Sequence, residues 1–252
     1  MKLSSNVTSL LATCLSATLF SGILSAQAET VRVLSYNVQD CFNLGRKDQN
    51  VERTAEVIRK LAPDVAGIQE LDRRTKRSKG HDIAGELAEK TGMELSYGKT
   101  IQFQGGEYGI GILSKKKPVR SYKVPLPGKE EKRALQIAEF ETYVFFCTHL
   151  SLTKASQIES VPLINAEAAK FSKPIILVGD FNANPDSETI REFRKTWKQV
   201  SLNGFTFPAN EPKIQIDYIF LRTDKPFQAM NAAIIEEPST SDHRPISVEL
   251  TW

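Results

Sequence analysis

The sequence contains few of the residues whose spacing alone can identify a protein class. Its 252 residues include three cysteines and three histidines. Cys41 and Cys147 are the two cysteines beyond the N-terminal segment, and a chain of this length does not need a disulfide to fold. We therefore expect two free thiols, with a single disulfide between them as the alternative.

Charge and composition exclude little. The net charge is only +3, which permits a polyanionic partner without requiring one. The 40% hydrophobic and 25% charged residues are ordinary for a soluble globular protein. Internal repeats, low-complexity blocks and linker-like shifts of composition are absent, so one domain is predicted over residues 29–252.

The first 28 residues are typical of a secretory signal peptide. Lys2 gives a positive start, residues 7–24 are mostly apolar, and Ala-Gln-Ala at 26–28 matches the small-x-small cleavage pattern. We expect cleavage near Ala28, export to the periplasm or beyond, and no stable membrane insertion afterwards. An uncleaved anchor is the alternative, although this apolar run is at the short limit for spanning a bilayer.

The hydrophobic pattern beyond residue 28 predicts short strands that alternate with helices. Strands are expected at 31–38, 65–70, within 105–114, and at 134–140, 143–150, 174–182, 214–221 and 246–250. Helices are expected at 51–61, from 83 to a stop at Gly92, over roughly 153–171 with an interruption at Pro162, and from a cap at 186–187 through Trp197.

Polar side chains recur at or near the ends of these strands, which predicts a layered α/β protein whose site collects on one rim. They are Asn37, Glu70, His149, Asp180, Asn182, Asp217, Asp242 and His243. The oxygen donors Glu70 and Asp242, with one or both of Asp180 and Asn37, suit a hard cation such as Mg²⁺ better than zinc. The two histidines and the spare carboxylates remain for proton transfer and charge stabilisation.

Structural interpretations of the same residues stay open. Residues 174–185 can be a strand followed by an Asn-Pro turn, Asn37 a strand-end turn, and Asp217 half of a buried salt bridge. The basic loop at 72–79 is either a solvated surface or an anion-contacting edge beside Glu70. In the second case Arg73 and Arg74 contact the substrate.

Six short motifs in this order resemble the motif set of the endonuclease/exonuclease/phosphatase superfamily. They are Ser-Tyr-Asn-Val at 35–38, Ile-Gln-Glu at 68–70, Thr-His-Leu at 148–150, Gly-Asp-Phe-Asn at 179–182, Ile-Asp-Tyr at 216–218 and Ser-Asp-His at 241–243. The superfamily includes pancreatic-type deoxyribonucleases, apurinic endonucleases, inositol-polyphosphate 5-phosphatases and bacterial sphingomyelinases. The resemblance implies a four-layered α/β sandwich, with two mixed β-sheets face to face and helices outside, and metal-assisted hydrolysis of phosphoesters.

The same resemblance implies a metal site at Glu70. Glu70 would bind Mg²⁺, Asn37 would lie beside it and contact the metal or the phosphate, and Asp242 would contribute directly or through water. Mn²⁺ is the expected substitute for Mg²⁺.

Catalytic roles are implied for five further residues. Asp180 would orient and deprotonate the attacking water, and Asn182 would hold the phosphate or that water. His243 would bind a phosphoryl oxygen while Asp217 fixes its tautomer and raises its pKa. His149 would be a second phosphate ligand or the leaving-group acid.

The chain also departs from particular relatives. Ile110 occupies a position where some relatives have asparagine, and Tyr108 is near the position of the phosphate-contacting tyrosine of the apurinic endonucleases. Tyr108 is therefore a candidate substrate contact. No stretch resembles the membrane-docking hairpin of secreted sphingomyelinases or an inserted DNA-gripping loop rich in arginine and aromatic residues.

These observations predict an exported, Mg²⁺-dependent monomeric phosphodiesterase. Nucleic acid is the first substrate prediction, because of export and of the basic loop. A phospholipid or inositol-phosphate hydrolase is the alternative within the same fold. A binding module without catalysis is the non-enzymatic alternative, but every charged position that the chemistry needs is present.

Overall fold

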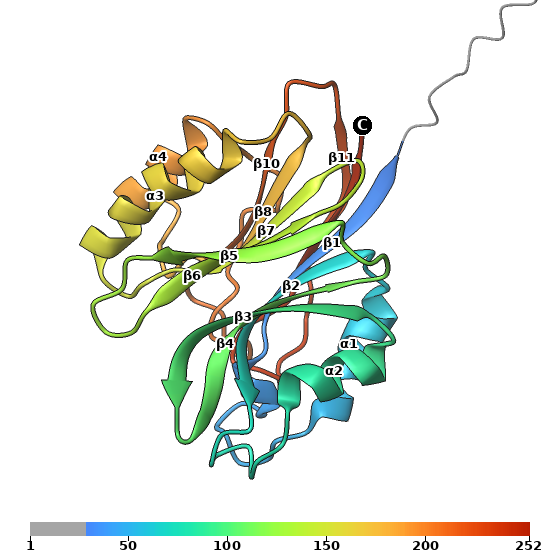
Figure 1. Cartoon of the computed structure of the whole chain (residues 1–252), viewed down its shortest axis with the longest axis vertical. Helices are drawn as coiled ribbons and strands as arrows, with labels where there is room; N and C mark the ends of the chain where they lie inside the picture. The colour runs from blue at the N-terminus through green and yellow to red at the C-terminus, as the bar shows by residue number, and fades with distance from the viewer. Residues whose placement is uncertain (1–28) are drawn as a thin grey trace, which may run out of the picture.

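The strands of the described chain form two six-stranded sheets that pack face to face, with a pair of helices outside each (Figure 1). The computed structural model describes residues 29–252. The predicted four-layered α/β sandwich is confirmed. The predicted signal peptide lies outside the described residues, and within 29–252 no helix is long and apolar enough to cross a membrane.

The first sheet is mixed and has the order β11-β12-β1-β2-β4-β3. Only β1 and β2 run parallel among its neighbouring pairs. Helices α1 and α2 cover its outer face (Figure 1). The bounds are β1 Thr30–Asn37, α1 Val51–Leu61, β2 Val65–Arg73, α2 Ile83–Thr91, β3 Glu94–Phe103, β4 Gly106–Ser114, β11 Gln228–Ile234 and β12 Ile246–Thr251.

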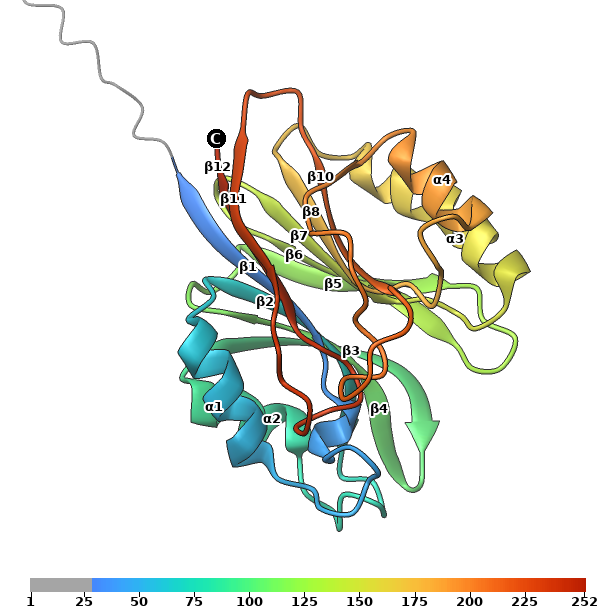
Figure 2. The ribbon, with the colours of Figure 1, turned by 180° about the vertical axis from the view of Figure 1, so that it is seen from behind.

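The second sheet has the order β5-β6-β7-β8-β10-β9, with β7 and β8 as its parallel pair. Helices α3 and α4 cover its outer face, and Figure 2 shows them from behind. The bounds are β5 Arg120–Leu126, β6 Arg133–Glu139, β7 Val144–His149, α3 Lys154–Ala168, β8 Ile175–Asp180, α4 Glu188–Arg194, β9 Lys198–Gln199 and β10 Asp217–Arg222.

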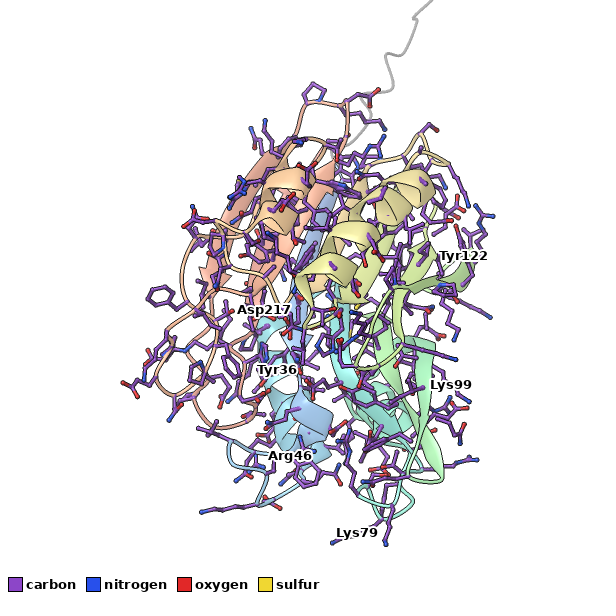
Figure 3. All side chains as sticks on the ribbon, turned by 90° about the vertical axis from the view of Figure 1, so that its left-hand side faces the viewer. Tyr36, Arg46, Lys79, Lys99, Tyr122 and Asp217 are labelled. Atoms are coloured by element: carbon purple, nitrogen blue, oxygen red, sulfur yellow. The ribbon has the colours of Figure 1, made fainter. Side chains whose placement is uncertain are left out.

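The main core lies between the sheets, where side chains such as Val33, Ile112, Phe145 and Val178 are buried against one another. Strand side chains alternate, so the other face of each sheet packs against its helices. Figure 3 shows how densely side chains fill these layers, with Asp217 near the middle of the molecule. The two cysteines within residues 29–252, Cys41 and Cys147, are buried free thiols, as expected.

Several elements have the predicted bounds because their local signals agree with the packing. Helix α1 begins after Asn50, whose side chain accepts from the Arg53 N–H at 3.1 Å, and it buries Val51, Ala55 and Ile58. Helix α2 is followed by Gly92, which has the left-handed φ of 67° that favours glycine at this position.

Other expectations were wrong. Helix α3 continues through Pro162, because Val161 and Ile164 on either side bury their side chains against the second sheet and offset the lost backbone hydrogen bond. Strand β10 begins only at Asp217, and α4 ends at Arg194 rather than Trp197. Strands β3, β5, β9 and β11 were not predicted, and in each of them many side chains are only partly buried.

Candidate active site

A cavity of about 490 Å³ opens at one end of the sandwich, where the predicted polar residues meet. The segments before β10 and before β12 both run to this end of the molecule (Figure 2). Six of the eight predicted strand-end residues line the cavity, namely Glu70, His149, Asp180, Asn182, Asp242 and His243. Asn37 and Asp217 are buried and contact the residues that line it.

The second sheet brings three of these residues together by strand register. In β8, Asp180 pairs with His149 of the parallel strand β7 and with Asp217 of the antiparallel strand β10. A Cβ atom at Gly179 would lie only 2.0 Å from the Thr148 carbonyl oxygen, so glycine permits this close approach before Asp180. The sequence Gly-Asp therefore places a carboxylate between two functional neighbours.

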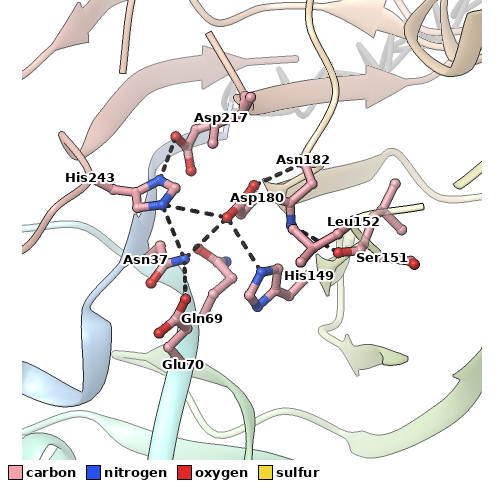
Figure 4. Close-up of polar contacts among 12 residues, drawn as sticks. Asn37, Gln69, Glu70, His149, Ser151, Leu152, Asp180, Asn182, Asp217 and His243 are labelled. Carbon is pink, nitrogen blue, oxygen red and sulfur yellow. Dashed lines mark hydrogen bonds and ion pairs between the residues drawn. The ribbon is translucent and has the colours of Figure 1, made fainter. Parts of the chain in front are cut away.

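The Asp180 carboxylate is held by hydrogen bonds to both of its oxygens. Its Oδ1 accepts from the Asn182 backbone N–H at 2.9 Å, and its Oδ2 accepts from Asn37 Nδ2 at 3.1 Å (Figure 4). The Nε2 atoms of His149 and His243 lie 3.4 Å and 3.6 Å from the same Oδ2. Burial raises the pKa of Asp180, and the nearby His243 only partly opposes this effect.

His243 lies between two carboxylates. Its Nδ1 is 2.9 Å from Asp217 Oδ2, which also accepts from Thr206 Oγ1 at 2.6 Å. Burial by itself lowers the pKa of His243, but the carboxylates of Asp217 and Asp180 outweigh burial and raise it. The ring is therefore protonated at neutral pH, and Asp217 fixes the orientation of its Nδ1–H.

His149 has a different electrostatic environment. Burial lowers the pKa of its imidazole, and the positive charges of Arg133 and His243 lower it further. A neutral His149 can still donate one N–H to an oxygen atom in the cavity, but it does not add charge there.

Glu70 reaches the cavity from an irregular part of the first sheet. The register of β2 against β4 shifts between Ile68 and Leu71, and Glu70 within this bulge has a φ of 60°. The strand was predicted to end at Glu70, but it continues to Arg73 after the bulge. The bulge turns the Glu70 side chain toward Asn37, whose Nδ2 donates to Oε1 at 3.1 Å.

The side chains of Glu70 and Asp242 fit a hard cation. Both carboxylates line the cavity, and the negative charge of Glu70 helps to raise the pKa of Asp242, after the larger effect of burial. Within residues 29–252 neither forms a salt bridge to a lysine or arginine. A bound divalent cation would relieve their mutual repulsion, and oxygen ligands are what Mg²⁺ prefers.

A second cluster of possible metal ligands, formed by two aspartates and a histidine, is less suited to a cation. Ligand atoms of Asp180, Asp217 and His243 lie within 4.8 Å of one another. Both ring nitrogens of His243 already face carboxylate oxygens, so the histidine itself balances the two negative charges.

The three residues that the sequence suggested as substrate contacts do not all lie at the cavity. Tyr108 lines the cavity, whereas Arg73 and Arg74 do not. Arg73 forms a bidentate ion pair with Asp82, and Arg74 is exposed to solvent. Lys79, in the same basic loop, points outward from an end of the molecule (Figure 3).

Sequence reasoning missed two charged residues of the cavity, Glu131 and Arg133. Arg133 is only 6% exposed and forms ion pairs of 3.0 Å with Glu130 and 3.1 Å with Glu131. The run Lys-Glu-Glu-Lys-Arg at 129–133 has the composition of a solvated loop, and its only useful signal was that Arg133 immediately precedes an apolar strand. Gln39 and Ser241, which contact Asp242 and Asn37, were also missed.

Comparison with known proteins gives a family match over most of the chain. The model of the Endonuclease/Exonuclease/phosphatase family matches residues 34–243. No curated protein matches the chain significantly.

Solved structures share the fold at low sequence identity. A family protein from Bacteroides thetaiotaomicron has a TM-score of 0.73 and 20% identity, over 90% of this chain and 96% of its own. A mannosyl-6-phosphatase from the same organism has a TM-score of 0.71 and 19% identity, over 88% and 100%. The human Nocturnin catalytic domain has a TM-score of 0.66 and 15% identity, over 89% and 97%.

Proposed function

Because the chain belongs to the endonuclease/exonuclease/phosphatase family, we propose that it is a Mg²⁺-dependent phosphoester hydrolase in which Asp180 activates water and His243 stabilises the phosphoryl group. Members of this family are phosphoester hydrolases and include nucleases and phosphatases. The observation that carries the proposal is the connected set of contacts around one Asp180 oxygen. Asn37, His149 and His243 all lie within 3.6 Å of it at the cavity.

Each residue of this set meets one need of the reaction. A phosphoester is protected from nucleophiles by its own negative charge, so positive or N–H groups must face its oxygens before water attacks. Protonated His243 supplies a charge, and the Asn182 side chain and neutral His149 supply further polar contacts. Asp180, whose pKa is raised by burial, is a stronger base than an exposed carboxylate and accepts the proton of the attacking water.

Glu70 and Asp242 would hold the cation, and Mn²⁺ would be able to replace Mg²⁺. Bound there, the cation would withdraw charge from a phosphoryl oxygen. Asn37 presents its Nδ2 to both Glu70 and Asp180, so it orients the two carboxylates rather than providing an oxygen ligand. These side chains separate cation binding from proton transfer.

The charged residues of the cavity favour a small phosphorylated substrate over nucleic acid. A nucleic acid strand carries one charge per nucleotide and is gripped by several lysines and arginines along a groove. Among the residues that line this cavity, Arg133 is the only arginine or lysine, and two glutamates already pair with it. The basic loop residues Arg73 and Arg74, which supported the nuclease prediction, do not line the cavity.

We also propose the mature domain, the location and the oligomeric state of the protein. Residues 29–252 are the mature catalytic domain, they are exported after cleavage near Ala28, and they act as a monomer. The composition of the N-terminal segment supports the first two.

Hydrolysis assays on the purified protein test the main proposal. We expect p-nitrophenyl phosphate or bis-p-nitrophenyl phosphate to be hydrolysed with Mg²⁺ and not with EDTA. Asp180→Asn should lower turnover by at least about 10²-fold, as expected on losing a general base. Asp186→Asn is the matched control, because Asp186 is exposed six residues further along and does not line the cavity.

Two outcomes would contradict the proposal. Absence of turnover with every divalent cation would refute the enzyme, and wild-type turnover in Asp180→Asn would refute the assigned base. A parallel panel of sugar phosphates, inositol phosphates, sphingomyelin, plasmid DNA and RNA decides the substrate class. Preferred cleavage of DNA or RNA, falling steeply with salt, would restore the nuclease prediction.

A further inference from the structure

The segment after β1 contains a left-handed turn made entirely of residues other than glycine. Gln39, Asp40 and Cys41 have φ values of 47°, 53° and 59°. Residues with a Cβ atom rarely adopt this backbone conformation, because the Cβ atom then approaches the backbone too closely. Three successive residues of this kind persist only where the surrounding contacts hold them, and such strained segments cluster at functional sites.

Buried charges hold this turn from one side. The Asp40 carboxylate is buried and lies 2.6 Å from Arg77 and 2.9 Å from Arg46. Arg77 also forms an ion pair with Asp72 at 2.7 Å, and its guanidinium lies over the ring of Tyr108. Arg77 belongs to the predicted basic loop, but its guanidinium pairs with buried carboxylates inside the protein.

A second glutamine stabilises the same turn without reaching the cavity. Gln49 Nε2 donates to the Asp40 carbonyl oxygen at 2.8 Å. Among the described residues, its side chain forms no hydrogen bond with Asp242 or Asn37. Gln49 therefore offers a way to weaken the turn alone.

Gln39 connects the turn to two residues of the proposed cation site. Its backbone N–H donates to Asn37 Oδ1 at 3.2 Å, which leaves Asn37 Nδ2 directed at Glu70 and Asp180. Its side-chain Nε2 donates to Asp242 Oδ2 at 2.6 Å. Within this left-handed turn, one residue makes both contacts.

We propose that Gln39 is a positioning residue of the cation site, which acts by orienting the Asp242 carboxylate and the Asn37 amide. The inference rests on the proposed function, because Asp242 and Glu70 are the cation ligands assigned there. A side chain that only stabilised the turn would not need a polar contact with a ligand in the cavity. Residues that orient metal ligands in this way commonly change metal affinity 10- to 100-fold when they are removed.

Cation binding measured without substrate tests this inference. The protein is stripped with EDTA and dialysed, and its melting temperature is followed during titration with Mg²⁺, since a cation that binds the folded state raises Tm with concentration. Gln39→Leu should raise the Mg²⁺ concentration at half-effect by about tenfold or more. Gln39→Asn keeps the amide but shortens it by one methylene, and it should give a smaller increase.

Gln49→Leu is the matched control. It should lower Tm in the absence of Mg²⁺, because it removes a hydrogen bond from the same turn, but it should leave the half-effect concentration unchanged. Equal half-effect concentrations in the wild type, Gln39→Leu and Gln39→Asn would overturn the inference. If the wild type itself shows no Mg²⁺-dependent change in Tm, the proposed cation site fails and the role of Gln39 fails with it.

Discussion

The two sheets contribute to the site in different ways. The second sheet delivers His149, Asp180 and Asp217 from the ends of regular neighbouring strands, so strand register alone brings them together. The first sheet delivers Glu70 from a bulge, and Asn37 is oriented by a left-handed turn. Regular pairing thus positions the proposed acid–base groups, whereas irregular backbone positions Glu70, a proposed cation ligand, and Asn37 beside it.

The two sheets also differ in how much their polar side chains contribute to stability. The side chains around Asp180 lie at strand ends, and removing one of them leaves the hydrophobic layers of the sandwich intact. The irregular segments of the first sheet depend instead on buried ion pairs, above all those of Asp40 and Asp72 with Arg77. We therefore expect mutations at the second sheet to affect chemistry and mutations behind the first sheet to affect stability.

The largest expected effect is the loss of His243. His243→Ala should lower turnover by at least about 10²-fold, because it removes the positive charge proposed to stabilise the phosphoryl group. Circular dichroism should show an unchanged fold. His81→Ala is the matched control, since His81 is exposed and pairs only with Glu86 at the surface. Comparable turnover in the two variants would refute the catalytic role of His243, which the second-sheet residues Asp180 and Asp217 contact.

A stability measurement tests the expectation for the first sheet. Arg77→Met should lower the free energy of unfolding by about 3 kcal/mol, because it leaves two buried carboxylates without this partner. Urea denaturation followed by tryptophan fluorescence measures the change. The exposed neighbour provides the control Lys76→Met, which should change stability by less than about 0.5 kcal/mol. Equal stabilities would show that the buried charges do not hold the first-sheet segments.

The second-sheet half of the site was predictable from sequence because its signals are local. Asp180 follows an apolar run, and the glycine before it permits close strand approach, so both the strand and the position of the carboxylate follow from neighbouring residues. The same holds for His149 at the end of β7. The family resemblance carried by the motif order then supplied the sandwich architecture, which hydrophobic periodicity alone does not specify.

The first-sheet half was less predictable because its signals are not local. Nothing in the residues 39–41 indicates a left-handed turn, since none of them is glycine, and the partner that holds Asp40 is Arg77 on a distant loop. Strand β3 was missed because Gly98 and Lys99 interrupt its apolar alternation. Arg133 was missed because its charged neighbours resemble a surface run, although the fold buries it beside the cavity.

The smallest expected effect is a shift in pH dependence when Asp217 is changed. The proposed mechanism requires Asp180 without its proton and His243 with its proton, so the rate should rise with pH through the raised pKa of Asp180 and fall again through the raised pKa of His243. Asp217→Asn removes the carboxylate that contributes most to raising the pKa of His243. The alkaline limb of the kcat/KM profile should therefore move to lower pH by about one unit or more, because one unit corresponds to only about 1.4 kcal/mol of lost charge interaction.

Thr206→Val, which removes the other hydrogen bond to Asp217 and keeps its charge, should move the limb much less. An alkaline limb at the same pH in the wild type and Asp217→Asn would show that strand register at the second sheet places Asp217 beside His243 without tuning it.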